Sequence, residues 1–215
     1  VYTRVRNQGI VLVAAAGNDG CYRLGWPAES PTTIAVSAVG PSLTLTPYSN
    51  YGPDVFLAAP GGDQSGGSAN GVLSTLPGDG YGFFQGTSMA SPHVAGVAAL
   101  VRSVNPGLTP SAIYDLLART ATDLGASGPD TSYGYGLVNA EAAVAEARSL
   151  LEASTLAFVA RVSGPASREV AVAADGSFAF PDLPEGAYLL EVGTDVDGNG
   201  VLAEPGEFYA SRGVT

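Results

Sequence analysis

The segment at residues 86–96, GTSMASPHVAG, constrains the fold of this chain more than any other part of its sequence. It starts with a glycine, and Ser88 stands at the beginning of a run with helical character that extends to about residue 103. Small residues recur along this run at Ala90, Ala95, Gly96, Ala98 and Ala99. A helix that is small and apolar on every side is expected to be buried, with its neighbours packed close.

Ser88 is a candidate nucleophile because of its place at the start of this helix. An alcohol attacks a carbonyl only when a base takes its proton and hydrogen-bond donors stabilise the oxyanion. The free N–H groups at a helix start point at such a negative charge. Pro92 is expected to fall in the first turn, where proline is tolerated. The simpler alternative is that Ser88 only caps the helix.

His93 is the only histidine of the chain, and it does not suit the role of base for Ser88. A separation of five residues on a helix turns the side-chain direction by about 500°, so the two side chains project roughly 140° apart. Four aspartates lie in predicted loops or, for Asp54, where a loop meets a predicted strand; solvated or turn roles are the rule there, and none is assigned to catalysis: Asp19, Asp54, Asp63 and Asp79.

The composition excludes several classes of protein. Of the 215 residues, 46% are hydrophobic and 13% are charged, as in a packed globular protein. All nine basic residues are arginines, which excludes a phosphate-loop lysine and a Schiff-base lysine. The net charge of -11 argues against nucleic acid and anionic membranes as partners. Cys21 is the only cysteine, so no internal disulfide is possible, and no apolar run is long enough to span a bilayer.

An alternation of strands and helices is predicted for the first 150 or so residues. Continuous apolar runs, typical of strands covered on both faces, lie at residues 10–16, 33–39 and 54–59. Residues 61–80 indicate a surface loop with a short hairpin around 72–76. Further helices are predicted at residues 1–9 with Gly9 as the stop, after Thr109-Pro110, and from Asn139 to about Leu151.

The pattern changes after Glu152, where apolar residues alternate with polar or small ones. Asp175-Gly176 and Glu185-Gly186 are turn signals between such runs. This pattern predicts a small antiparallel β-module. We therefore expect two domains, at residues 1–152 and 153–215.

A candidate calcium loop lies in this module at Asp195, Asp197, Asn199 and the carbonyl of Val201. Oxygen ligands at alternate positions followed by a glycine are what a calcium loop needs. The twelfth position holds Gly206 instead of the glutamate of an EF-hand, and the flanks indicate strands. The alternative is a tight Asn-Gly hairpin turn without a metal.

The first part of the chain resembles the subtilisin-like serine proteases, or subtilases. The segment from Gly86 to Leu100 resembles the family's nucleophile segment. Further matches follow the family's order at residues 11–20, 26–28, 34–36, 48–52, 58–61 and 134–140. The resemblance covers nearly all of residues 1–150 as the C-terminal part of the catalytic domain. It implies an α/β fold, a subtilisin-like parallel sheet flanked by helices, with its N-terminal part missing.

The resemblance also implies a function, that of a secreted serine endopeptidase acting on polypeptides without a catalytic cofactor. Ser88 is carried over as the nucleophile and Asn18 as the side-chain donor of the oxyanion hole. Ala14, Ala15, Ala16 and Gly17 are expected to line the primary specificity pocket and pair with the substrate backbone. The aspartate and histidine of the triad are expected before Val1, so this chain alone is expected to be inactive.

The β-module resembles the prealbumin-like, carboxypeptidase-regulatory type of accessory domain, a small antiparallel β-sandwich. An α/β-hydrolase esterase is excluded because Ala90 replaces the second glycine of its Gly-x-Ser-x-Gly motif. One alternative stays open, a non-catalytic protein: a pseudo-protease, or a surface or binding module with structural calcium. The residues expected before Val1 discriminate between the enzyme and this alternative.

Overall fold

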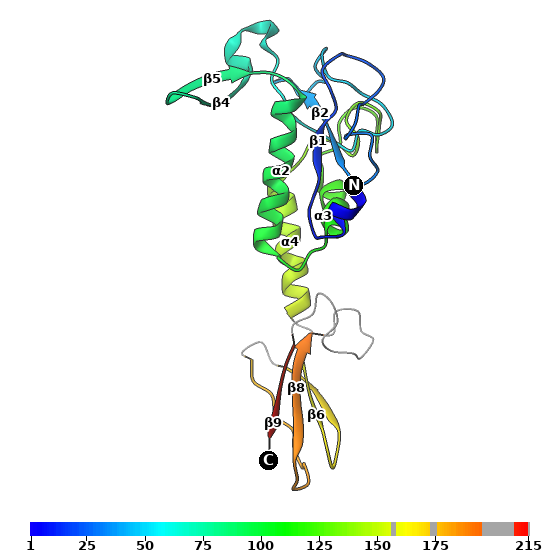
Figure 1. Cartoon of the computed structure of the whole chain (residues 1–215), viewed down its shortest axis with the longest axis vertical. Helices are drawn as coiled ribbons and strands as arrows, with labels where there is room; N and C mark the ends of the chain where they lie inside the picture. Colours follow the sequence, from blue (N-terminus) through cyan, green and yellow to red (C-terminus); the bar gives the residue numbers. More distant parts are fainter. Residues whose placement is uncertain (156–157, 173–175, 195–208, 215) are drawn as a thin grey trace. The chain divides into compact units, whose positions relative to one another are not determined.

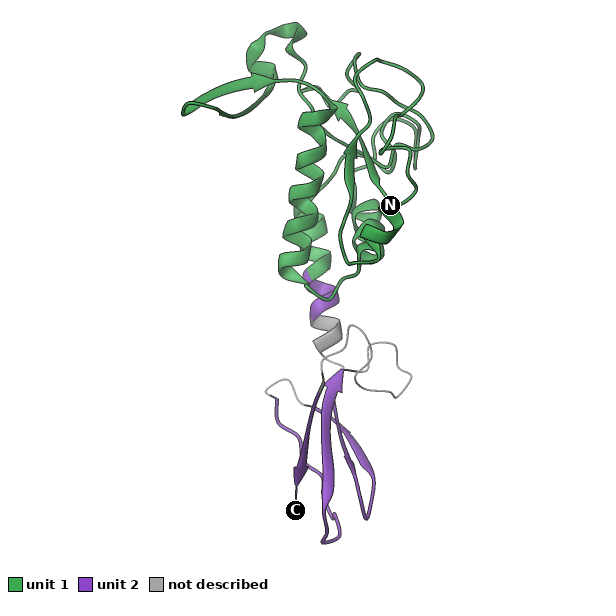
Figure 2. Ribbon diagram, viewed as in Figure 1, with its two compact units in different colours: residues 1–147 green, residues 148–215 purple. Residues whose placement is uncertain are grey.

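The computed structural model describes residues 1–155, 158–172, 176–194 and 209–214. The chain forms two compact units, Val1–Ala147 and Arg148–Thr215 (Figure 2). The helix α4, Ala140–Thr155, contains the division between them. The domain boundary near residue 153 stays a prediction. None of the helices in the described ranges is long and apolar enough to cross a membrane.

The first unit is built on a parallel sheet of three strands in the order β1-β2-β3. These are β1 (Val13–Ala15), β2 (Ile34–Val39) and β3 (Leu57–Pro60). Every residue of β2 is buried, as its apolar run predicts. The first predicted strand is too long, because Ile10 is 48% exposed and regular pairing begins only at Val13.

Helix α2 (Thr87–Val104) packs against all three strands, and Figure 1 shows it beside β1 and β2. Its buried face includes Ala90, Val94 and Val101. They share one apolar core with β2, β3 and the inner face of α3 (Pro110–Thr120). The prediction that α2 is buried on every side is wrong for this chain. A second face is exposed, with Ala95, Gly96, Ala99 and Leu100 on it.

Pro92 does not lie in the first turn of α2, as predicted, but inside the helix. The helix begins at Thr87, so Pro92 is its sixth residue. Proline has no N–H, so the carbonyl of Ser88 lacks the usual donor four residues later. Ser88 is exposed, and water can solvate that carbonyl.

The remaining elements of the first unit follow the sequence pattern closely. Helix α1 is Tyr2–Arg6, and two 3-10 turns, η1 (Gln64–Gly66) and η2 (Ser68–Asn70), precede the hairpin. The predicted hairpin consists of β4 (Val72–Leu76) and β5 (Gly80–Phe84). Asp79 lies in its turn with a positive φ of 59°, which agrees with a turn role.

The second unit contains one antiparallel sheet in the order β7-β6-β8-β9. The strands are β6 (Phe158–Ser163), β7 (Arg168–Ala171), β8 (Tyr188–Thr194) and β9 (Tyr209–Val214). The antiparallel pairing agrees with the sequence pattern. A second sheet, which a sandwich requires, is not present in the described part of this unit. The candidate calcium loop at 195–201 lies outside the described residues.

Candidate active site

Ser88 is the second residue of α2, and its side chain is exposed. Gly86 precedes the helix with φ 144°, a conformation that favours glycine. The Gly86 N–H donates to the carbonyl of Gly61 at 2.9 Å and to the hydroxyl of Tyr48 at 3.1 Å. The segment that enters the helix is therefore held from the side of β3, and Ser88 is left at the surface.

Asn18 meets the start of this helix although it lies 69 residues from Thr87. Its side-chain oxygen accepts the Thr87 N–H at 2.8 Å and the Thr87 hydroxyl at 3.0 Å. The same hydroxyl accepts the N–H of Gly17 at 3.2 Å. Thr87 is fully buried, whereas Asn18 is exposed, so these hydrogen bonds lie at the edge of the core. The turn after β1 and the start of α2 are thus fixed to each other.

Two donors beside Ser88 have no acceptor among the described residues. The Oδ1 of Asn18 is committed to Thr87, and no hydrogen bond involves its Nδ2. In the first turn of α2, the N–H groups of Met89 and Ala90 both donate to the carbonyl of Gly86. The Ser88 N–H has no such partner. Two unpaired donors and an exposed hydroxyl therefore occur together, a set that can stabilise a developing oxyanion.

Ala14, Ala15, Ala16 and Gly17 form the end of β1 and the start of the turn that carries Asn18. The side chains of Ala14 and Ala16 are buried in a second apolar cluster with Leu24, Ala28, Ala35 and Val55. Ala15 and Gly17 are partly exposed. Their role in substrate specificity stays a prediction.

His93 is exposed, and its Nδ1 is hydrogen-bonded to the carbonyl of Met89 at 2.8 Å. This hydrogen bond holds the His93 ring against its own helix, one turn before His93. Asp63 caps η1, and its pKa is held below the ordinary value because the hydroxyl and N–H of Ser65 both donate to it. No cluster of three or more metal-ligating side chains occurs in the described ranges.

A hollow of about 300 Å³ adjoins the start of α2. It lies between the hairpin and the helix, lined by Val72, Leu73, Ser74, Met89, Pro92 and His93. The lining of this hollow is mainly apolar. It includes Met89, the residue that follows Ser88 in the helix. Sequence reasoning did not single out the hairpin as part of the site. Its exposed aromatic residues Tyr81, Phe83 and Phe84 are the signal that could have found it.

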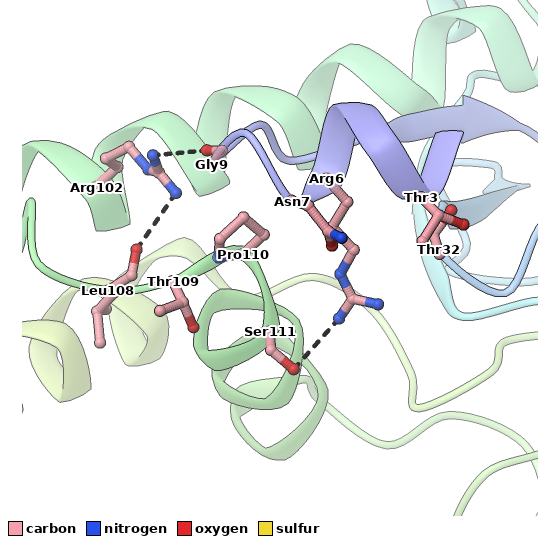
Figure 3. A pocket seen from close by; sticks show the side chains of 10 residues that line it. All are labelled: Thr3, Arg6, Asn7, Gly9, Thr32, Arg102, Leu108, Thr109, Pro110 and Ser111. Carbon is pink, nitrogen blue, oxygen red and sulfur yellow. Dashed lines mark hydrogen bonds between the residues drawn. The ribbon is translucent and has the colours of Figure 1, made fainter. Parts of the chain in front are cut away.

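A larger cavity of about 530 Å³ lies elsewhere, between α1 and the ends of α2 and α3 (Figure 3). Arg102 donates to the carbonyls of Gly9 and Leu108, and Arg6 donates to the hydroxyl of Ser111. The guanidinium of Arg6 also stacks over the ring of Tyr114. These arginines connect helices to neighbouring segments, and the cavity contains neither Ser88 nor Asn18.

The fold is of the subtilisin type, as comparison with known proteins shows. The model of the subtilase family matches residues 2–136. The chain belongs to the subtilase family.

Individual relatives show the same likeness. Alkaline elastase YaB of Bacillus sp. (strain YaB) is 46% identical over 135 residues, which are 63% of this chain and 33% of that protein. The halolysin-like extracellular serine protease Nep of Natrialba magadii is 46% identical over 136 residues, 63% of this chain and 23% of that protein. A solved protease of Pseudoalteromonas arctica PAMC 21717 aligns with a TM-score of 0.63 and 42% identity, over 68% of this chain and 45% of its own. The chain thus spans less than half the length of each.

Proposed function

We propose that this chain carries the nucleophile and the oxyanion donors of a serine endopeptidase that hydrolyses peptide bonds. The observation that carries the proposal is the pair of unpaired donors, Asn18 Nδ2 and Ser88 N–H, beside the exposed Ser88 hydroxyl. Membership of the subtilase family supports the same chemistry.

The reaction begins when the Ser88 hydroxyl oxygen attacks the carbonyl carbon of the scissile peptide bond. Its proton passes to a base that the described residues do not provide, since His93 lies five residues along the same helix and its side chain projects roughly 140° away from that of Ser88. The carbonyl oxygen becomes an oxyanion that accepts from Asn18 Nδ2 and Ser88 N–H. The amine then leaves with a proton, and water hydrolyses the ester on Ser88.

Several finer assignments belong to the same proposal. Ala14 to Gly17 contact the substrate backbone and line the primary specificity pocket. The protein acts outside the cytoplasm, as the name of the Natrialba relative says of that protein. Calcium, where it binds, stabilises the loop of Asp195, Asp197, Asn199 and Val201 and takes no part in the chemistry.

Substitution of the nucleophile tests the function directly. In the intact protein, Ser88→Ala should abolish peptide hydrolysis and labelling by a fluorophosphonate, because both need the hydroxyl oxygen. The control is Ser91→Ala, one turn further along α2 and only partly exposed, which should keep most of the activity. Full peptidase activity in Ser88→Ala would refute the assignment. An unmodified protein that neither hydrolyses peptides nor takes the label would instead be a pseudo-protease.

The role of His93 has its own test. A chain of residues 1–215 alone should not react rapidly with a fluorophosphonate, because no base lies beside Ser88 among the residues that the structure describes. Mass spectrometry of the treated chain measures the labelled fraction. Rapid stoichiometric labelling at Ser88 would show that His93, or another residue of this chain, can act as the base.

A further inference from the structure

Asn50 forms hydrogen bonds to residues on both sides of Asn18 in the turn that carries it. It is 5% exposed, and its Oδ1 accepts the N–H of Asp19 at 2.8 Å and the N–H of Cys21 at 3.1 Å. Its Nδ2 lies 3.5 Å from a carboxylate oxygen of Asp19. Its backbone N–H donates to the carbonyl of Gly17 at 2.9 Å. One buried residue thus holds the chain on both sides of Asn18.

The contact with Gly17 is close enough to require glycine there. Gly17 has φ 113°, and a Cβ at this position would lie 2.3 Å from the Nδ2 of Asn50. The shape of the turn and the side chain of Asn50 are therefore matched to each other. A further backbone hydrogen bond, from the N–H of Gly20 to the carbonyl of Tyr48 at 2.8 Å, also joins this turn to the segment that contains Asn50.

The segment that contains Asn50, residues 46–50, is itself fixed to the buried strand β2. The hydroxyl of Ser49 accepts the N–H of Ala38 at 3.0 Å, and the N–H of Thr46 donates to the Ala38 carbonyl at 3.0 Å. Tyr48, between them, contacts Gly86 just before α2. The 46–50 segment is therefore fixed to β2 and contacts both the turn that carries Asn18 and the residue before α2.

We propose that Asn50 is a positioning residue for the oxyanion site: it fixes the Gly17–Cys21 turn so that the amide of Asn18 is presented beside Ser88. This rests on the proposed function of Asn18 and Ser88. A hydrogen bond from that amide stabilises the bound substrate little and the transition state much more. Loss of the Asn50 side chain should therefore lower kcat and leave KM nearly unchanged.

The expected size of the effect follows from the cost of losing an oxyanion donor. In subtilisin, a relative of this chain, removal of the side-chain donor of the oxyanion hole lowers kcat by about 10²–10³. A displaced donor should do somewhat less damage than a missing one. We expect Asn50→Ala to lower kcat by roughly 10-fold to 100-fold and to weaken a peptide boronate inhibitor by a similar factor.

A double-mutant cycle in the intact protein separates positioning from a general structural role. Asn18→Ala, Asn50→Ala and the double variant are assayed for kcat and KM well below their unfolding temperatures. If Asn50 acts through Asn18, Asn50→Ala should add almost nothing to the loss in kcat once Asn18 is alanine. The matched control is Asn105→Ala, another buried amide (6% exposed), which donates to the Ala147 carbonyl away from the site. It should lower stability and leave kcat unchanged.

A charge-neutral exchange provides the rescue. The double variant Asp19→Asn with Asn50→Asp exchanges the two side chains. The new carboxylate at position 50 can accept the N–H groups of residues 19 and 21, and the new amide at position 19 can donate to it. The exchange should therefore restore most of the kcat that Asn50→Ala loses. The exchanged variant also serves if Asn50→Ala fails to fold, because it keeps the size of both side chains.

The outcomes distinguish the two proposals. A full additional loss of kcat from Asn50→Ala in the Asn18→Ala background would overturn the role of Asn50, as would a change confined to KM. In the exchanged variant, a folded protein with kcat still lowered would count against it equally. If Asn18→Ala itself leaves kcat and boronate affinity unchanged, the failure is in the proposed function of Asn18.

Discussion

At the scale of single residues, Thr87 connects two segments that lie far apart in the sequence. Its hydroxyl donates to Asn18 Oδ1 and accepts from the N–H of Gly17, while its own N–H also donates to Asn18. One side chain therefore sets the orientation of the Asn18 amide and satisfies a backbone donor. The motif at residues 86–96 draws attention to Ser88, but Thr87 joins Ser88 to its partner.

Thr87→Val tests this connection, since valine has nearly the same shape and lacks the hydroxyl. The N–H of Gly17, a partly exposed residue, loses its acceptor, and the loss of such a hydrogen bond costs about 0.5–1.5 kcal/mol. We therefore expect a lower free energy of unfolding by about that amount and a lower kcat, because the Asn18 amide loses one of its two donors. Urea unfolding and steady-state kinetics of the intact protein measure the two effects. Thr87→Ser retains the hydroxyl and should lose much less of either; equal losses in both variants would contradict the role of the hydroxyl.

The sequence predicted some of these residues and could not predict others. Ser88 and Asn18 stand in local segments whose resemblance to a family assigns them. Thr87, Asn50 and Tyr48 matter through hydrogen bonds to residues far along the chain, and no local pattern encodes such bonds. Their contacts appear only when the turn after β1 and the start of α2 are brought together.

At the scale of elements, two helices of the first unit start in different ways. Thr109 caps α3 through its own side chain, which accepts the Ala112 N–H at 3.2 Å, and Pro110 follows. The start of α2 has Gly86 as its cap residue and no local side-chain cap; Asn18 accepts its first N–H instead. Sequence pattern was sufficient for α3 because the cap is local. It was insufficient for α2, whose cap comes from another segment.

Thr109→Ala should lower the free energy of unfolding by about 1 kcal/mol, the usual effect of losing a side-chain cap. Activity at low temperature should not change, because Thr109 takes no part in the hydrogen bonds that hold Asn18 and Ser88. Thermal and urea unfolding measure the change, and Thr109→Ser is the control that keeps the cap. A stability equal to that of the unmodified protein would show that the capping bond contributes nothing here.

The exposed face of α2 shows a different limit of sequence reasoning. The run of Gly and Ala correctly predicts a helix that packs closely, and β1, β2 and β3 take one face of it. Which of its other faces are covered depends on partners, and the composition of the helix cannot supply them. Within the described ranges no element covers the face with Ala95 and Leu100.

At the scale of the whole molecule, two tyrosines, the buried Tyr114 and the partly buried Tyr48, connect separate segments of the first unit. The Tyr114 hydroxyl donates to the carbonyls of Leu12 and Thr32, and it joins α3 to the chain on either side of β1. The Tyr48 hydroxyl donates to the carbonyls of Gly61 and Gly62 before the hairpin. A phenolate could not donate in either place. Burial is the main cause that raises the pKa of both hydroxyls above the ordinary value of 10.0.

These raised pKa values predict how stability depends on pH. The folded protein holds both protons more tightly than the unfolded chain. The contribution of the two hydroxyls to the free energy of unfolding is therefore fully present below about pH 10. It is lost as the pH rises from there through the folded pKa values. The free energy of unfolding, measured by urea titration between neutral and strongly alkaline pH, should fall over that alkaline range. Tyr114→Phe and Tyr48→Phe should each make the fall shallower, since phenylalanine has no proton to lose. Tyr22→Phe, at a residue that is 61% exposed, is the control and should leave the slope unchanged. If the slope is the same in all three variants, the alkaline loss arises from other groups and the two hydroxyls do not couple stability to pH.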